Sequence, residues 1–177
     1  MSDVWLRPWR ITDHPVVAQM TRDPHLIRWS SLPTLGAEPW LTQQMAEAGG
    51  PSRAVCAGDE DTTLGKIALR LPGHASPATS SPAIRPDDHP VGELSYWIVP
   101  QARGRGLARA AVRAMLPLVA RAGLRTVVLD IELDNHASLR VAAHLGAERR
   151  APARVEPDRA GVPRTLAVHV LRLTPAG

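Results

Sequence analysis

A short turn with alternating arginine and glycine, Arg-Gly-Arg-Gly, occupies residues 103–106. It follows the apolar run 92–99 and opens the run 106–122, in which apolar residues recur at helical spacing. Backbone N–H groups at a helix start have no carbonyl partners and carry a partial positive charge, so they bind phosphate. Glycines let an anion approach the backbone and arginines add charge-assisted hydrogen bonds, although a tight turn with solvated arginines is the plainer alternative. The residues expected to contact the anion are Arg103, Gly104, Arg105, Gly106, Leu107 and Ala108.

The spacing of residues in this turn limits which phosphate-binding motif it can be. A Walker A loop requires a Gly-Lys pair followed by Ser or Thr, which the sequence lacks, and a dinucleotide fingerprint requires a small residue where Arg109 stands. The remaining pattern is Gln/Arg-x-x-Gly-x-Gly/Ala, met by Gln101, Gly104 and Gly106. It resembles the loop with which the GNAT superfamily of N-acetyltransferases binds the pyrophosphate of acetyl-CoA. The resemblance implies acetyl-CoA as the co-substrate. No metal is expected, because His136 and His144 are too isolated for a metal site.

The resemblance covers nearly the whole chain outside residues 72–90. Residues 91–116 and 129–150 are similar to the two core segments of the RimJ/RimL-type branch, and residues 6–29 are similar to its opening, where "LRP" and "DP" recur. The family implies an α/β (α+β) fold with a mixed, mostly antiparallel sheet of about seven strands. In that fold a central strand–helix–strand–helix unit binds acetyl-CoA, and the fourth and fifth strands splay apart to admit the thioester.

Two alanines depart from the family pattern. Ala147 replaces the aromatic residue of an "LGF" ending, and Ala142 stands where many members carry a tyrosine general acid, which excludes tyrosine chemistry there. By resemblance, Ser138 is the replacement hydrogen-bond donor for the leaving thiolate; a bond to the Asn135 backbone is the alternative. Asn135 begins the last helix as a good N-cap, and the resemblance also places it beside the cofactor.

Acetyl transfer needs a neutral amine and a polarised carbonyl, so a base and hydrogen-bond donors are required. The family resemblance implies that backbone N–H groups near Ile98 and Val99 serve the pantetheine and the carbonyl oxygen. It also implies two candidate bases: Glu93, an acidic residue inside an apolar strand, ranks first, and Asp130, five residues before the asparagine, ranks second. Glu132 lies on the same strand face as Asp130. An ordinary arginine pair is an equal explanation for any one of these carboxylates.

The elements that position these residues follow from periodicity. A strand at 92–99, a helix at 106–122, a strand at 125–133 and a helix at 135–146 imply one parallel pair of strands. Pro117 is expected to bend or interrupt the first of these helices. Because runs of strands flank this unit, the sheet should be mixed and mostly antiparallel. Further strands are expected at 4–9, 52–59 and 63–71 and on either side of a turn at 158–161, with helices at 12–20 and 37–50 and a loop with one helical turn between them.

Bulk properties limit the classes of protein. The length of 177 residues suits one domain, with a proline-rich insertion at 72–90. A net charge of +4 and a pI near 10.5 favour an anionic partner, but scattered arginines and few aromatic residues argue against nucleic acid. The single cysteine, Cys56, excludes an internal disulfide, and no signal peptide or membrane span is evident. A cytoplasmic monomer or homodimer is expected.

The sequence therefore predicts an N-acetyltransferase that moves acetyl from acetyl-CoA to a primary amine, first of all a protein N-terminal amine. A small-molecule amine such as an antibiotic or a polyamine is the alternative acceptor, and a CoA-binding module without catalysis is the alternative class. Trp29 and Trp40 lie in segments that in this family line the acceptor groove, with core packing an equal explanation.

Overall fold

The computed structural model of the chain describes residues 3–29, 36–74, 90–150, 152–158 and 161–173, so most of the insertion expected at 72–90 lies outside the described residues. The chain divides into two compact units, one of Met1–Ala68 with Tyr96–Met115 and one of Leu69–Ser95 with Leu116–Gly177. The elements are β1 (Val4–Arg7), α1 (His14–Met20), α2 (Pro24–Trp29), α3 (Ala37–Ala46), β2 (Ser52–Ala57), β3 (Glu60–Arg70), β4 (Val91–Ile98), α4 (Leu107–Arg121), β5 (Thr126–Glu132), α5 (His136–His144), β6 (Glu148–Arg149), β7 (Arg154–Pro157) and β8 (Pro163–Arg172).

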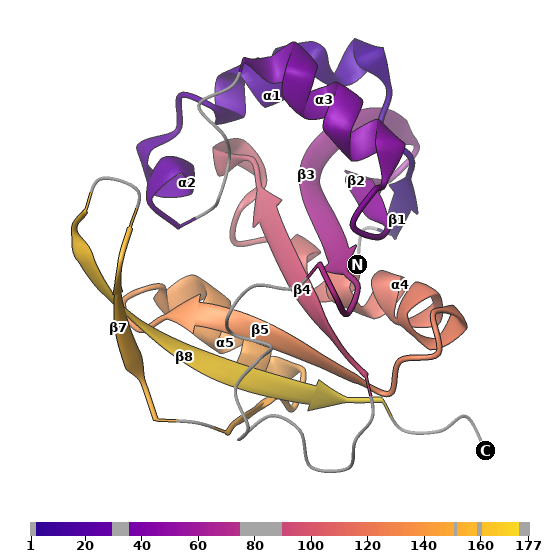
Figure 1. The fold of residues 1–177 in the computed structure, drawn as a ribbon. Helices are drawn as coiled ribbons and strands as arrows, with labels where there is room; N and C mark the ends of the chain where they lie inside the picture. Colours follow the sequence, from indigo (N-terminus) through magenta and orange to yellow (C-terminus); the bar gives the residue numbers. More distant parts are fainter. Residues whose placement is uncertain (1–2, 30–35, 75–89, 151, 159–160, 174–177) are drawn as a thin grey trace. The chain divides into compact units, whose positions relative to one another are not determined.

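Antiparallel strands covered by helices make up most of the first unit (Figure 1). β1 pairs with β2, and β2 pairs with β3 in a register that sets Ala54 opposite Lys66. Helix α3 contacts both α1 and β2. Met20 of α1, Leu41 of α3 and Ala54 of β2 are fully buried, which makes this side of the sheet a hydrophobic core.

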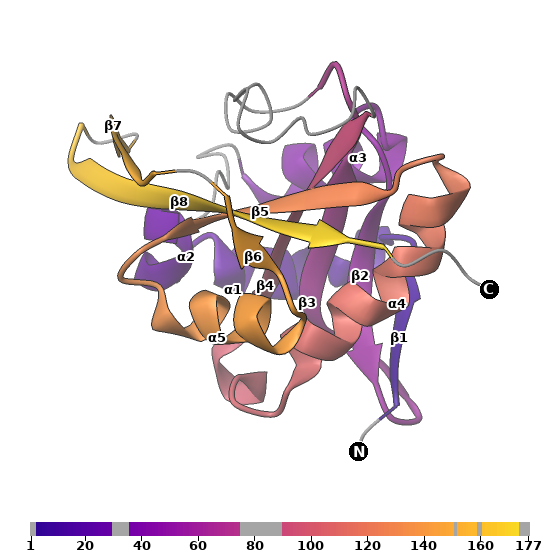
Figure 2. The same ribbon diagram turned by 90° about the horizontal axis from the view of Figure 1, so that it is seen from below.

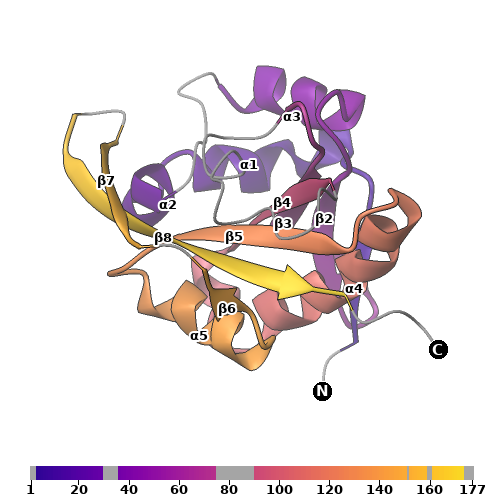
Figure 3. The same ribbon diagram turned by 60° about the horizontal axis from the view of Figure 1, so that its bottom comes forward.

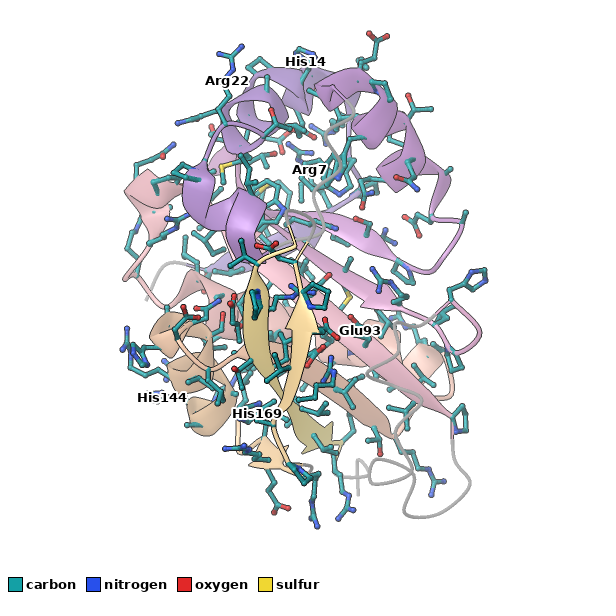
Figure 4. All side chains as sticks on the ribbon, turned by 60° about the vertical axis from the view of Figure 1, so that its left-hand side comes forward. Arg7, His14, Arg22, Glu93, His144 and His169 are labelled. Carbon is teal, nitrogen blue, oxygen red and sulfur yellow. The ribbon has the colours of Figure 1, made fainter. Side chains whose placement is uncertain are left out.

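A buried ion pair ties β1 to the segment that follows it. Two nitrogens of Arg7, which Figure 4 labels, donate to the two carboxylate oxygens of Asp13 over 2.8 and 2.7 Å. The Thr63 hydroxyl and the Arg10 backbone N–H also donate to Asp13, over 2.6 and 2.9 Å. Burial alone would raise the pKa of Asp13, but these hydrogen bonds outweigh it and hold the pKa below its ordinary value. The ionised carboxylate therefore stabilises this unit.

Three tryptophans pack together above the sheet of the first unit. The ring centroids of Trp9 and Trp40 lie 5.1 Å apart in an edge-to-face arrangement, and Trp97 lies 6.2 Å from Trp9 and 6.4 Å from Trp40. The ammonium of Lys66, the only lysine in the sequence, lies 5.3 Å from the centroid of the Trp40 ring. This distance is that of a cation–π contact.

The second unit is organised around β8. β5 pairs with β8 antiparallel from Thr126 to Glu132, and the short strands β6 and β7 pair with β8 as well. β5 pairs in parallel with the start of β4, from Val91 to Glu93. Helix α5 contacts β5 and lies beside β6, as Figures 2 and 3 both show. The parallel pair is the one that the sequence predicted.

The sheet order is β1-β2-β3-β4-β5-β8-β6, with β7 also paired to β8, so the predicted mixed and mostly antiparallel α/β fold is confirmed. The sheet has eight strands rather than about seven, and α2 is a helix where a loop with one turn was expected. Pro117, expected to bend or interrupt this helix, does not interrupt it, since α4 runs through it. Proline removes the hydrogen bond to the carbonyl of Arg113, but both residues are exposed, where water can satisfy that carbonyl.

Candidate active site

The glycine turn before α4 presents an open backbone. Gly104 and Gly106 both have a φ of 77°, a left-handed conformation that favours glycine. A Cβ atom added at either position would meet no protein atom within 4 Å. The carbonyl of Gly106 accepts the Ala110 N–H over 3.1 Å, so the helix begins at this glycine. Conformation rather than packing therefore explains both glycines, and their backbone is open beside the start of a helix, where N–H groups can bind an anion.

The two arginines of the turn differ in their surroundings. Arg105 is exposed. Arg103 bends back into the first unit, where its Nε donates to the carbonyl of Ile98 over 3.0 Å and its Nη2 donates to Asp23 over 2.6 Å. Arg103 was expected to contact a phosphate, but two of its donors are engaged within the protein.

The end of β4 was expected to offer backbone N–H groups. The N–H of Val99 instead donates to the carbonyl of Leu64 over 2.9 Å, which occupies it. The strands meet closely here, because a Cβ on Gly65 would lie 2.3 Å from the carbonyl oxygen of Trp97. Of the two expected donors, Val99 is thus engaged within the protein.

Glu93, labelled in Figure 4, lies on β4 in the second unit. Its side chain is 12% exposed, and Arg70 Nη1 lies 3.5 Å from each carboxylate oxygen, at the outer limit of a hydrogen bond. The carboxylate is therefore largely shielded from water, with the Arg70 guanidinium at the outer limit of hydrogen-bonding distance.

Asp130, on β5, is held much more tightly. Arg154 of β7 donates to both of its carboxylate oxygens, with one contact at 3.0 Å from Nη1 to Oδ1 and a second from Nη2 to Oδ2. Burial raises the pKa of Asp130; the Arg154 hydrogen bonds oppose this shift, and the nearby Glu93 adds to it. Both oxygens of this carboxylate thus accept hydrogen bonds from one guanidinium in a bidentate pair.

The ion pair continues along the β7–β8 hairpin. Arg154 Nε donates to Glu156 over 3.3 Å, and Arg164 of β8 donates to the same carboxylate over 2.7 Å. No motif in the sequence marks these arginines, because only the pairing of β7 with β8 brings them together. The same holds for His169 of β8, a buried side chain whose pKa is lowered by its burial (Figure 4).

Asn135 and Ser138 meet at the start of α5. The Asn135 side-chain oxygen accepts the backbone N–H of Ser138 over 3.1 Å, so Asn135 is the N-cap of the helix. The Ser138 side chain is half-buried. The second unit therefore brings Glu93, Asp130, Asn135 and Ser138 into one body, while the glycine turn and Ile98 belong to the first.

Of the two tryptophans expected to line the acceptor groove, only Trp40 has a described side chain. Trp40 is 2% exposed and packs against Trp9 and Trp97, which favours the core-packing explanation. Trp29 is the last residue of α2, and its side chain lies outside the described residues.

Within the described ranges, no group of three or more His, Cys, Asp or Glu side chains is arranged to hold a metal ion. No helix in that part of the chain is long and apolar enough to cross a membrane.

Comparisons with known proteins establish the family. The model of the acetyltransferase (GNAT) domain matches residues 3–148, so the chain belongs to the GNAT acetyltransferase family. The enzyme class predicted from the sequence is therefore confirmed, and acetyl-CoA is the donor in this family. No curated protein sequence matches the chain significantly.

Solved structures of low sequence identity share the fold. The protein yncA from Salmonella typhimurium, solved with its cofactor acetyl-CoA, is 18% identical with a TM-score of 0.70, over 99% of this chain and 96% of that one. RimJ from Mycobacterium smegmatis, in complex with CoA-disulfide, is 18% identical with a TM-score of 0.72, over 96% and 81%. The spermidine/spermine N-acetyltransferase SpeG from Vibrio cholerae is 14% identical with a TM-score of 0.70, over 96% and 94%.

Proposed function

We propose that this acetyltransferase moves the acetyl group of acetyl-CoA directly to a primary amine with a single positive charge, and that a protein N-terminal amine is the first candidate. The observation that supports the proposal most is the glycine turn, whose backbone is open at Gly104 and Gly106. A turn of this kind at a helix start binds pyrophosphate through backbone N–H groups. A RimJ/RimL-like activity is the finer form of this proposal.

Each candidate residue has one role in the proposal. Acetyl-CoA supplies a thioester carbonyl that a neutral amine can attack. The Ile98 N–H polarises that carbonyl. Glu93 removes the proton from the amine directly or through water, and the Ser138 hydroxyl donates a hydrogen bond that stabilises the departing thiolate. Asn135 holds the first turn of α5 in place and lies beside the cofactor. Arg105, Leu107 and Ala108 join the two glycines in binding the pyrophosphate.

Glu93 is a better candidate base than Asp130. A base must accept a proton from the acceptor, and both oxygens of Asp130 already accept hydrogen bonds from Arg154. Glu93 has a more distant arginine, at 3.5 Å. The contrast in these partners, rather than the position of either residue along its strand, ranks the two carboxylates.

The arginine partners of three carboxylates in the second unit support an acceptor with one positive charge. A polyamine or an aminoglycoside carries several ammonium groups and needs several carboxylates without partners. Asp130, Glu93 and Glu156 each have an arginine partner. An N-terminal amine adds one charge followed by neutral peptide groups, which places less demand on these carboxylates.

An acceptor screen tests the proposal through release of free CoA from acetyl-CoA. The panel contains a peptide with a free N-terminus and no lysine, the same peptide with an acetylated N-terminus, and spermidine. We expect release with the free peptide alone. Faster release with spermidine would overturn the proposed acceptor, and CoA binding without turnover on a wide amine panel would favour the non-catalytic module.

A further inference from the structure

Arg103 links three segments that are far apart in the sequence. It lies in the turn before α4, its Nε donates to the carbonyl of Ile98 at the end of β4, and its Nη2 donates to Asp23, 80 residues earlier. All three residues belong to the first unit. Because one guanidinium makes both bonds, the positions of the three segments depend on one another.

Asp23 marks the junction between α1 and α2. Its backbone N–H donates to the Met20 carbonyl over 3.1 Å, and its own carbonyl accepts the Ile27 N–H over 2.9 Å. The residue thus closes the end of α1 and opens α2. Movement of the Asp23 side chain therefore shifts the start of α2 as well.

The burial of the two partners is unequal. The Asp23 side chain is 7% exposed, whereas the Arg103 side chain is 40% exposed. Removal of one partner of a buried ion pair is strongly destabilising, so loss of Arg103 is expected to disturb Asp23 and the start of α2, which its backbone helps to form. Breaking the pair costs less at Arg103, because water can reach its exposed guanidinium. The ion pair therefore stabilises the surroundings of Asp23 more than it stabilises the exposed face of the turn.

We propose that Arg103 is a positioning residue, which couples the α1–α2 junction to the turn that binds CoA, rather than a ligand of the CoA phosphates. This inference rests on the proposed function, because it takes the glycine turn as the CoA site. It implies that Asp23, which lies at the α1–α2 junction, controls CoA affinity through Arg103. Since coupling between two sites is reciprocal, CoA binding in turn steadies α2.

Calorimetric titration with CoA separates a positioning role from phosphate binding. The variants are Arg103→Ala, Asp23→Asn and their combination, with Arg53→Ala as the control because Arg53 pairs with Glu47 in the same unit. We expect both single variants to weaken CoA binding by about 5- to 150-fold, the range of typical coupling. The double variant should be no weaker than Arg103→Ala, and the control should match the parent.

A phosphate ligand behaves differently in the same cycle. If Arg103 binds phosphate, Asp23→Asn releases it and CoA affinity stays unchanged or rises, while Arg103→Ala alone weakens binding. That result would overturn the proposal. Arg103→Lys serves as a second variant in case Arg103→Ala is unstable. A lysine keeps the charge but has one nitrogen for the two bonds, so a positioning role predicts weakened binding and a pure charge role predicts near-parent binding.

Hydrogen exchange distinguishes failure of this inference from failure of the proposed function. Absence of CoA binding in the parent protein would remove the proposed function. The positioning role is then tested in the absence of CoA, by comparing the amide exchange rates of Arg103→Lys and the parent protein. We expect faster exchange in both 24–29 and 99–107 and no change in Arg53→Ala. Faster exchange in only one of these segments, or in neither, would overturn the coupling.

Discussion

Replacement of Gly104 by valine tests the glycine turn most directly. The φ of 77° at this position is one that L residues rarely adopt and β-branched residues adopt least. A valine would rotate the turn away from this conformation at a cost of about 1–2 kcal/mol or more. The N–H groups aimed at the pyrophosphate would then be misdirected.

The expected loss of affinity follows from those N–H groups. A hydrogen bond to a charged group contributes about 1.5–3 kcal/mol. Loss of two such bonds removes about 3–6 kcal/mol, and each 1.4 kcal/mol is about tenfold in Kd. Gly104→Val should therefore weaken CoA binding by roughly 100-fold or more, measured by calorimetric titration.

The chain offers a matched control in the turn between β2 and β3. Gly58 has a φ of 70°, and a Cβ there would meet no atom within 4 Å, as at Gly104. Gly58→Val imposes the same backbone strain in the same unit, away from the glycine turn. Its Tm should fall as much as that of Gly104→Val while its CoA affinity stays that of the parent. Equal affinity of Gly104→Val and the parent would refute the assignment of this turn as the CoA site.

Three further measurements address the carboxylates and the serine. In pH–rate profiles, Glu93→Gln should lower kcat most at low pH, where the amine is protonated, and Asp130→Asn should have the smaller effect; the reverse ranking would assign the base to Asp130. Ser138→Ala should lower kcat by roughly 10²–10⁴-fold at every pH with normal CoA affinity, and recovery at high pH would contradict a donor role. Asp13→Asn should lower the free energy of unfolding at pH 7 by about 3–5 kcal/mol, or Tm by roughly 6–20 °C. Because the pKa of Asp13 is lowered in the folded state, this stabilisation is complete above the ordinary aspartate pKa and is lost as the pH falls through the folded-state pKa. An Asp13→Asn variant with the parent's Tm at pH 7 would contradict a stabilising role for this carboxylate.

Elements with local causes could be predicted from the sequence. The helix at 107–121 follows from its apolar spacing, and the N-cap at Asn135 follows from the preference of that residue type for helix starts. The parallel pairing of β4 with β5 follows from the helix between them. In each case the information lies within one element and its immediate neighbours in the chain.

The partners of charged residues could not be predicted in this way. Arg103 pairs with a residue 80 positions away, and Arg154 reaches Asp130 because two strands pair with β8. Many arginines compete for each carboxylate, and only the folded chain selects among them. The sequence therefore identified Glu93 and Asp130 as candidates, but the difference in how tightly each is held comes from the structure.

The contact between Lys66 and Trp40 has a consequence for an enzyme that handles an activated acyl donor. Reactive thioesters also modify lysine side chains without a catalyst, and only a deprotonated amine is nucleophilic. This chain has one lysine, and its ammonium nitrogen lies 5.3 Å from the centroid of the Trp40 ring. Nearly all of the protein's cationic side chains are arginines, which stay protonated at all working pH values and so supply positive charge without adding nucleophilic amines.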